Sequence, residues 1–409
     1  MGFVFAIFVN MKHLVIVGGG IVGVATAYQV WMNHPEVKIT IIEKESGLAA
    51  HQTGHNSGVI HSGIYYKPGS LKAKNCLRGY QMLINFCESK NIPFELCGKV
   101  IVATDESEFK ALDILYERGI ENGLEGLIKL NETQIKEYEP HARGLKGIYV
   151  PQTGIVNYRR LTEALGEELA SSDRVDICTN ESVTGFESLQ DGVKVKTNKR
   201  ELKVDKVINC AGLYCDKIAE LAGEKLHVRI IPFRGEYYTI KPEKAHLVKS
   251  LIYPVPDAQF PFLGVHFTRR ITGEIEAGPN AVFAFKREGY HKSSFSLSDF
   301  LGSIMWRGFQ KVAVKYWKTG IGEYYRSFSK SAFTRALQKL IPEITEKDLE
   351  PAPAGVRAQA VDKDGSLLDD FYIQESKHFI HVLNAPSPAA TSSLSIGLTV
   401  SERLNFDKE

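Results

Sequence analysis

The sequence predicts an α/β fold with a dinucleotide-binding unit near its start and a second part built on a mainly antiparallel sheet. An apolar stretch at 15–17 runs directly into a glycine-rich turn at 18–23. Two later apolar stretches, at 204–210 and 379–384, also lead through small residues into helical patterns. Between 228 and 279 short apolar runs alternate with polar residues, which is typical of antiparallel strands.

The glycine-rich turn has the spacing of a dinucleotide-binding fingerprint. Gly18 permits the tight turn, Gly20 lets the backbone approach a pyrophosphate, and Gly23 lets helix and strand pack closely. A helix is predicted to begin near Ile21 and Val22. The free N–H groups of its first turn and the positive end of its dipole then face the phosphates.

A second predicted strand, at 37–42, is followed by Glu43 and Lys44. A carboxylate in this place, roughly 20 residues or more after the turn, binds a ribose hydroxyl in such units. The polar loop at 51–66 is rich in Gly, His and Ser, a composition suited to lying against a flat ligand. From this loop the predicted cofactor-binding residues are His51, Thr53, Asn56 and Ser57.

The loop motif His51-Gln-Thr-Gly-His-Asn-Ser-Gly-Val-Ile-His61 and eight other segments resemble one enzyme family. That family is the L-2-hydroxyglutarate oxidases or dehydrogenases, within the superfamily of FAD-dependent D-amino-acid oxidases and glycerol-3-phosphate dehydrogenases. The other segments are 97–99, 232–237, 253–256, 261–266, 278–281, 285–290, 353–360 and 384–391. The resemblance implies that the dinucleotide is FAD.

The resemblance also implies a Rossmann-like FAD-binding domain assembled from discontinuous segments, which we place at 11–85, 147–225 and 350–409. An α+β substrate domain would then comprise 86–146 and 226–349, with a helical insert at about 296–344. Residues 1–10 are left as an N-terminal extension. The later strands are expected to complete the cofactor site with Ala211, Gly212, Pro388, Ala389 and Thr391.

The chemistry implied by the resemblance is oxidation of L-2-hydroxyglutarate, a small dicarboxylate 2-hydroxy acid, to 2-oxoglutarate. Hydride would pass from C2 to flavin N5, and the electrons onward to a quinone or O2. Such a site needs a base for the hydroxyl proton and cations for the carboxylates. His61 and His266 are the candidate bases because imidazole titrates near neutral pH, and the sequence leaves the choice between them open.

Arg357 and Arg234 are the candidate cations because a guanidinium binds a carboxylate through two parallel hydrogen bonds. We count Arg357 with the catalytic residues as well. For Arg234 an alternative is an ion pair with Glu236 that serves the fold. Tyr253 and Thr268 are expected to donate further hydrogen bonds to the substrate.

Composition narrows the function classes. A chain of 409 residues with 44% hydrophobic content can bury a large core, and a net charge of +2 does not indicate a nucleic-acid partner. The six cysteines have no metal-ligand or disulfide-framework spacing, so we expect no metal. The remaining alternatives are an FAD enzyme that acts on another small acid, of malate or glycine type, and a non-catalytic flavoprotein.

The predicted insert contains a basic amphipathic helix. Its basic face comprises Arg307, Lys311, Lys315 and Lys318. Its apolar face is predicted to comprise Met305, Phe309, Val312, Ala313 and Tyr316. This pattern is typical of a helix on an anionic bilayer, near a membrane quinone acceptor, and also of a surface helix packed on its own core. We expect a cytoplasmic protein with peripheral contact to the inner face of the membrane.

Overall fold

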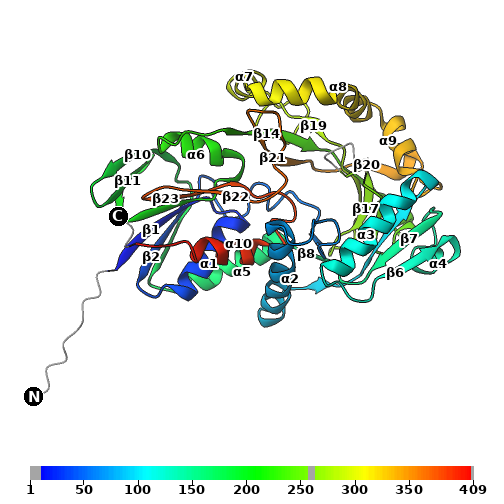
Figure 1. Cartoon of the computed structure of the whole chain (residues 1–409), viewed down its shortest axis with the longest axis horizontal. Helices are drawn as coiled ribbons and strands as arrows, with labels where there is room; N and C mark the ends of the chain where they lie inside the picture. The colour runs from blue at the N-terminus through cyan, green and yellow to red at the C-terminus, as the bar shows by residue number, and fades with distance from the viewer. Residues whose placement is uncertain (1–10, 257–262, 407–409) are drawn as a thin grey trace, which may run out of the picture.

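The computed structural model describes residues 11–256 and 263–406 of the chain. The N-terminal extension proposed for residues 1–10 lies outside these residues. The described part contains two large sheets, with three smaller ones beside them. Figure 1 shows the first large sheet toward the end of the molecule where the described part of the chain begins and ends, and the second toward the opposite end.

The first large sheet has six strands, and five of them run parallel. Its order is β22 (Tyr372–Glu375), β23 (Phe379–Asn384), β13 (Lys206–Asn209), β1 (Lys12–Val17), β2 (Val37–Ile42) and β9 (Val175–Cys178). Strands β1, β2, β13 and β23 are buried along nearly their whole length, as expected for parallel strands covered on both faces. Segments far apart in the sequence thus build one sheet.

Helices cover one face of this sheet. They are α1 (Ile21–Asn33), α2 (Leu71–Ser89), α5 (Tyr158–Ala170) and α10 (Ser393–Ser401). Two of them begin with a side-chain cap: Ser70 accepts a hydrogen bond from the N–H of Ala73, and Asn157 accepts one from that of Arg160. The opposite face packs on the small sheet of β10 (Val183–Leu189), β11 (Gly192–Thr197) and β12 (Glu201–Val204), and α6 (Cys215–Leu221) follows β13.

The second large sheet has eight strands, all antiparallel except for the pair β16–β5. Its order is β20 (Leu349–Pro351), β15 (Tyr238–Ile240), β18 (Ile275–Gly278), β17 (His266–Arg269), β16 (Leu251–Pro254), β5 (Lys99–Ala103), β7 (Lys146–Val150) and β6 (Ile128–Asn131). Its associated helices are α3 (Phe109–Glu121), α4 (Glu132–Tyr138) and α9 (Lys330–Leu337).

A three-stranded sheet runs between the two large ones (Figure 1). It consists of β19 (Val282–Phe283), β14 (Val228–Gly235) and β21 (Gly355–Asp362). The helices α7 (Leu297–Ile304) and α8 (Arg307–Phe328) lie along its outer side (Figure 1). The last small sheet joins β3 (Val59–Ile60), β8 (Gly154–Val156) and β4 (Phe94–Glu95).

The predicted fold class is confirmed: a discontinuous parallel sheet stands beside a mainly antiparallel one. One local expectation needs correction. The predicted apolar face of the basic helix divides, because Phe309 and Val312 in α8 pack inward whereas Met305, which lies between α7 and α8, is exposed. The last helix begins at Ser393, after a turn that contains a cis peptide bond before Pro388.

Candidate active site

A cavity of about 390 Å³ opens at the carboxyl ends of β1, β2, β13 and β23. This edge of a parallel sheet is where open α/β folds bind their ligands. Twelve of the predicted cofactor-binding residues line the cavity: Gly18, Gly20, Ile21, Val22, Glu43, Lys44, His51, Thr53, Asn56, Ala211, Gly212 and Ala389. The separated segments therefore meet around one space.

The glycine turn is held open by two hydrogen bonds. Glu43 accepts the N–H of Gly19 at 2.6 Å, and the hydroxyl of Thr53 accepts the N–H of Ile21 at 2.9 Å. Gly20 is the N-cap of α1 and has no side chain to satisfy the other N–H groups of the first turn. A Cβ at Gly20 would meet only the Thr53 hydroxyl, at 3.4 Å. An uncapped helix terminus beside a carboxylate at the end of β2 fits the phosphates and ribose of FAD.

Four predicted cofactor-binding residues do not line the cavity: Gly23, Ser57, Pro388 and Thr391. Gly23 acts in packing, since a Cβ there would lie 2.0 Å from the carbonyl oxygen of Gly18. The hydroxyl of Thr391 accepts the N–H of His61 and lies 2.8 Å from that of Tyr158, so it joins the loop of His61 to the start of α10. Sequence reasoning missed several other lining residues, including Gln52, Glu181, Tyr214, Lys217 and Ala358.

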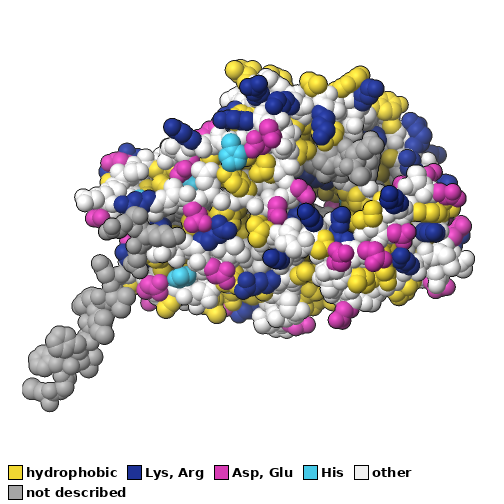
Figure 2. Space-filling view, viewed as in Figure 1, with side chains coloured by type: hydrophobic (Ala, Val, Ile, Leu, Met, Phe, Trp, Pro, Cys, Tyr) yellow, Lys and Arg dark blue, Asp and Glu magenta, His cyan; other side chains and the backbone are white. Residues whose placement is uncertain are grey.

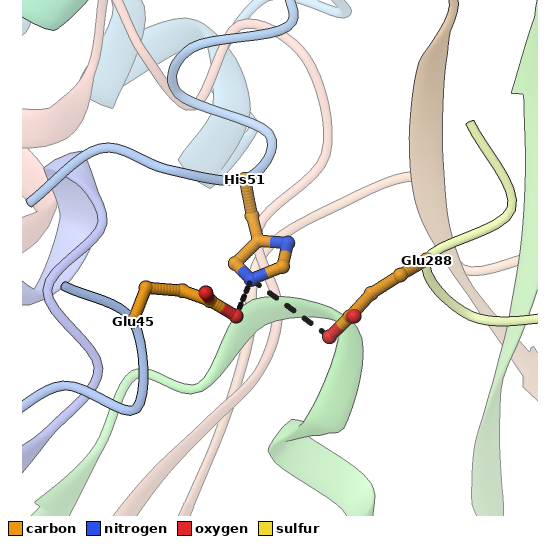
Figure 3. A group of neighbouring side chains, drawn as sticks. All are labelled: Glu45, His51 and Glu288. Carbon is orange, nitrogen blue, oxygen red and sulfur yellow. Dashed lines mark hydrogen bonds and ion pairs between the residues drawn. The ribbon is translucent and has the colours of Figure 1, made fainter. Parts of the chain in front are cut away.

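Glu45, His51 and Glu288 form a cluster at the rim of the cavity (Figure 3). His51 Nε2 lies 2.9 Å from a carboxylate oxygen of Glu45 and 3.8 Å from one of Glu288. These groups have the types and spacing of metal ligands, but the ammonium of Lys44 forms ion pairs with both carboxylates. The cluster thus has its own cation. It joins the loop after β2 to the chain segment that follows β19.

A second group of polar side chains projects from one face of the eight-stranded sheet. Tyr253 in β16 is in register with Ile101 in β5, so Lys99, two residues earlier, points to the same side. Thr268 in β17 is in register with Leu251, which places Thr268 and His266 on that side too. The rings of His266 and Tyr253 are in contact, with centroids 4.0 Å apart and planes tilted by 33°, and the hydroxyls of Tyr253 and Thr268 are 3.5 Å apart.

Both candidate bases are held in the neutral form. Burial, together with the nearby Lys99 and His266, lowers the pKa of His61 to about 3. Burial also lowers the pKa of His266 to about 3. His266 Nδ1 lies 2.8 Å from the carbonyl oxygen of Gly264, so in the neutral ring it donates its proton there and leaves the Nε2 lone pair available. Nδ1 of His61 is buried without a hydrogen-bond partner among the described residues.

The two candidate arginines do not converge. In the register of β14 and β21, Arg357 is opposite Phe233 and Arg234 is opposite Val356, so the two guanidinium groups leave opposite faces of the strand pair. Arg234 donates two hydrogen bonds to one carboxylate oxygen of Glu236, at 3.0 and 2.8 Å. This is the structural ion pair that the sequence left as an alternative. Arg357 is electrostatically coupled to His266 instead.

Lys99 is the residue of this cluster that sequence reasoning did not single out. Only 1% of it is exposed, and its pKa is lowered to about 7 by burial. The one sequence signal that pointed to Lys99 was its place in the segment 97–99, which is among the segments that carry the family resemblance. Its burial depends on strands far away in the chain.

The comparisons with known proteins agree with this geometry. The sequence profile of the family described as "FAD dependent oxidoreductase" matches residues 13–403. A protein of Indibacter alkaliphilus named L-2-hydroxyglutarate dehydrogenase is 56% identical over 95% of this chain and 98% of its own length. The chain is a member of the L-2-hydroxyglutarate dehydrogenase family.

Other family members are similar along almost the whole chain. The mitochondrial L-2-hydroxyglutarate dehydrogenase of Homo sapiens is 47% identical over 96% of this chain and 88% of its own length. Among solved structures, the fold is similar to that of the dithionite-reduced L-alpha-glycerophosphate oxidase of Mycoplasma pneumoniae with FAD bound. That match has a TM-score of 0.78 at 24% identity and covers 98% of this chain and 96% of the other. FAD and oxidoreductase activity, both predicted, are thereby confirmed.

Proposed function

We propose that this family member oxidises L-2-hydroxyglutarate to 2-oxoglutarate at the cluster around His61, His266 and Arg357. The observation that carries the proposal is the pairing of neutral, buried imidazoles with buried cations beside the cofactor cavity. Ala358, which follows Arg357 in β21, lines that cavity. The 56% identity to a protein that bears the name of this activity supports the choice of substrate.

Each side chain has a role that follows from its chemistry. The guanidinium of Arg357 binds a substrate carboxylate and orients C2. A neutral imidazole of His61 or His266 accepts the proton of the substrate hydroxyl as the C–H bond breaks. Tyr253 and Thr268 are placed beside His266 to bind substrate oxygens. Bound FAD would supply the acceptor for the hydride that leaves C2.

In this proposal FAD is held by Glu43, by the glycine turn, and by Thr53 and Asn56 in the polar loop. The contribution of these residues can be measured separately from turnover, as the affinity of the FAD-free protein for FAD.

Anaerobic mixing of the purified yellow protein with L-2-hydroxyglutarate should bleach the flavin absorbance. Bleaching by malate or by glycine instead would identify one of the alternative substrates. A flavin that no small acid reduces would indicate a non-catalytic flavoprotein.

The two candidate bases are distinguished by single variants. For the residue that is the base, replacement by glutamine should lower the rate of flavin reduction by on the order of 100-fold or more and leave FAD bound. The other variant should change the rate far less. If both variants reduce flavin at the original rate, neither imidazole is the base.

We also propose that α7 and α8 rest on an anionic membrane surface, where a quinone could accept the electrons. The large exposed apolar residues of these helices and of the turn between them are Leu297, Leu301, Met305, Val314, Trp317, Ile321, Tyr325 and Phe328. Figure 2 shows hydrophobic side chains beside Lys and Arg along this edge of the molecule. No helix among the described residues is long and apolar enough to cross a bilayer. Contact would therefore be at the surface.

Sedimentation with vesicles tests the membrane proposal. The protein should bind vesicles that contain anionic lipid more strongly than neutral ones, and added salt should weaken the binding. Replacing Trp317, Ile321 and Lys318 by serine should abolish the difference. Equal binding to neutral and anionic vesicles would overturn the proposal.

A further inference from the structure

Lys99 differs from the other buried basic side chains near the site. Arg287 is paired with Asp216, Arg234 with Glu236, and Lys72 with Asp369. Lys99 is only 1% exposed, yet no carboxylate in the part of the chain that the structure describes lies within ion-pair distance of it. Charged groups in proteins are rarely buried without a partner. When Lys99 is protonated, no carboxylate among the described residues pairs with its charge.

The side chains around Lys99 are aromatic or uncharged. Its ammonium lies 4.4 Å from the ring centroid of Tyr65 and 5.0 Å from that of Tyr253. The thiol of Cys76, the group that is electrostatically coupled to Lys99, is kept neutral because burial raises its pKa to about 12. Ring faces stabilise a cation only partly. None of these neighbours supplies the missing charge.

Two further polar atoms of this cluster also lack partners. The hydroxyl of Tyr65 and Nδ1 of His61 are buried and form no hydrogen bond within the described residues. Buried polar atoms are nearly always satisfied, and exceptions occur where a ligand binds. A cation in β5, and a phenol and an imidazole in the loop after β3, suit a ligand with several acceptor oxygens.

We propose that Lys99 binds one carboxylate of the substrate while Arg357 binds the other, so that Lys99 makes the site selective for dicarboxylates over monocarboxylates. The substrate class rests on the proposed function. Both cations are close enough to His266 to act on it, since the charges of Arg357 and Lys99 each lower its pKa. A five-carbon dicarboxylate would present its hydroxyl-bearing carbon to the imidazoles while each end meets a cation.

The ionisation of Lys99 gives a second signature. Burial lowers its pKa to about 7, so in the empty site at pH 8 most of the amine is neutral. A bound carboxylate stabilises the ammonium form and raises this pKa, and the site then takes up a proton. His61 and His266, with pKa values of about 3, stay neutral at pH 8, and the raised pKa of Tyr65 keeps it protonated.

The experiment uses the purified FAD-containing protein and two ligands that cannot be oxidised at C2: glutarate, and valerate as its monocarboxylate match. Dissociation constants come from the shift in flavin absorbance, and proton uptake from calorimetry at pH 8 in two buffers. The variants are Lys99→Met and the matched control Lys72→Met, whose partner Asp369 is 92% exposed at its side chain and stays solvated.

The unchanged protein should bind glutarate far more tightly than valerate and take up about one proton with glutarate. Lys99→Met should weaken glutarate binding by on the order of 100-fold, abolish the uptake and leave valerate nearly unaffected. In Lys72→Met the dissociation constants for both ligands should stay within about twofold of those of the unchanged protein.

Three results would overturn the inference. They are equal affinity of the unchanged protein for both ligands, no proton uptake with glutarate, or unaltered glutarate affinity in Lys99→Met. The first two need no variant, so they apply even if Lys99→Met fails to fold. If glutarate binds as expected but L-2-hydroxyglutarate does not bleach the flavin, the proposed function fails and the role of Lys99 stands.

Discussion

The glycine turn of the cofactor site provides a prediction whose magnitude follows from distances. A methyl group added at Gly20 would meet only the Thr53 hydroxyl, at 3.4 Å, which is ordinary contact. The backbone at Gly20 is extended, with φ −76° and ψ 171°, so alanine fits it without strain. Gly20→Ala should therefore change the free energy of unfolding of the FAD-free protein by less than about 1 kcal/mol.

The same methyl group faces the cavity where the pyrophosphate is expected. It should weaken FAD binding by roughly 1–3 kcal/mol, or about 5-fold to 150-fold in the dissociation constant. Gly23→Ala is the contrasting change, since its methyl carbon would lie 2.0 Å from the carbonyl oxygen of Gly18. Separation to an ordinary 3.4 Å needs a shift of about 1.4 Å (3.4 − 2.0), so this variant should lose both stability and FAD affinity.

The assay has two parts. Urea unfolding of the FAD-free protein, followed by circular dichroism, gives stability, and quenching of flavin fluorescence on titration gives affinity. Gly47→Ala is the control, because no atom lies within 4 Å of the added carbon. If Gly20→Ala bound FAD as tightly as the unchanged protein, the assignment of the turn to the pyrophosphate would be refuted.

Three other predictions concern the substrate, the core and pH. Arg357→Met should raise the KM for L-2-hydroxyglutarate by on the order of 100-fold in steady-state assays while FAD stays bound, and an unchanged KM would contradict the role of Arg357. Asp216→Asn should lower the free energy of unfolding by about 3–5 kcal/mol in urea, because it removes the carboxylate that accepts two hydrogen bonds from the buried guanidinium of Arg287 and leaves only the more distant Asp299, at 3.8 Å. A loss below 1 kcal/mol would argue against that pair. The pKa values of His61 and His266 are lowered to about 3 by burial, so between pH 6.5 and 3 the unfolded chain binds the additional protons. Stability from these groups is therefore full above pH 6.5 and falls on acidification by up to about 1.4 kcal/mol per pH unit for each histidine. The variant with both residues changed to glutamine should show a flatter decline in urea midpoints from pH 7 to 5, and an identical decline would contradict the assignment.

The cofactor site was largely predictable because its signals are local in sequence. Gly18, Gly20 and Glu43 are recognised by their spacing along one strand–turn–helix–strand unit, and the structure places all three at the cavity. Ala211 and Ala389 were found because each follows an apolar strand. Tyr214 was missed because nothing in its immediate sequence shows that its side chain turns toward the cavity.

The substrate cluster was only partly predictable because it depends on register between distant strands. His266 and Tyr253 lie on one face of neighbouring strands. The alternation of apolar and polar residues between 228 and 279 allowed these strands, and therefore this face, to be predicted. Lys99 reaches the same face only because β5 pairs with β16, about 150 residues later in the chain. Arg234 in β14 and Glu236 just after it are two residues apart, so their pairing was visible as an alternative.

The apolar face of α8 was assigned wrongly in part because the helix has apolar residues on two sides. Phe309 and Val312 pack on the core, whereas Val314 and Trp317 are exposed. Helical periodicity alone does not show which of two apolar rows meets the core. That depends on the sheet of β14 and β21, whose partners are far apart in the sequence.

The most direct test of the central claim is the anaerobic visible spectrum of the FAD-containing protein during addition of L-2-hydroxyglutarate. The D-enantiomer, malate and glycine serve as controls. The account predicts that the L-acid alone bleaches the flavin and that 2-oxoglutarate appears in equal amount. Bleaching by malate or glycine with none by L-2-hydroxyglutarate would contradict the proposed activity and leave the fold and cofactor site unchanged.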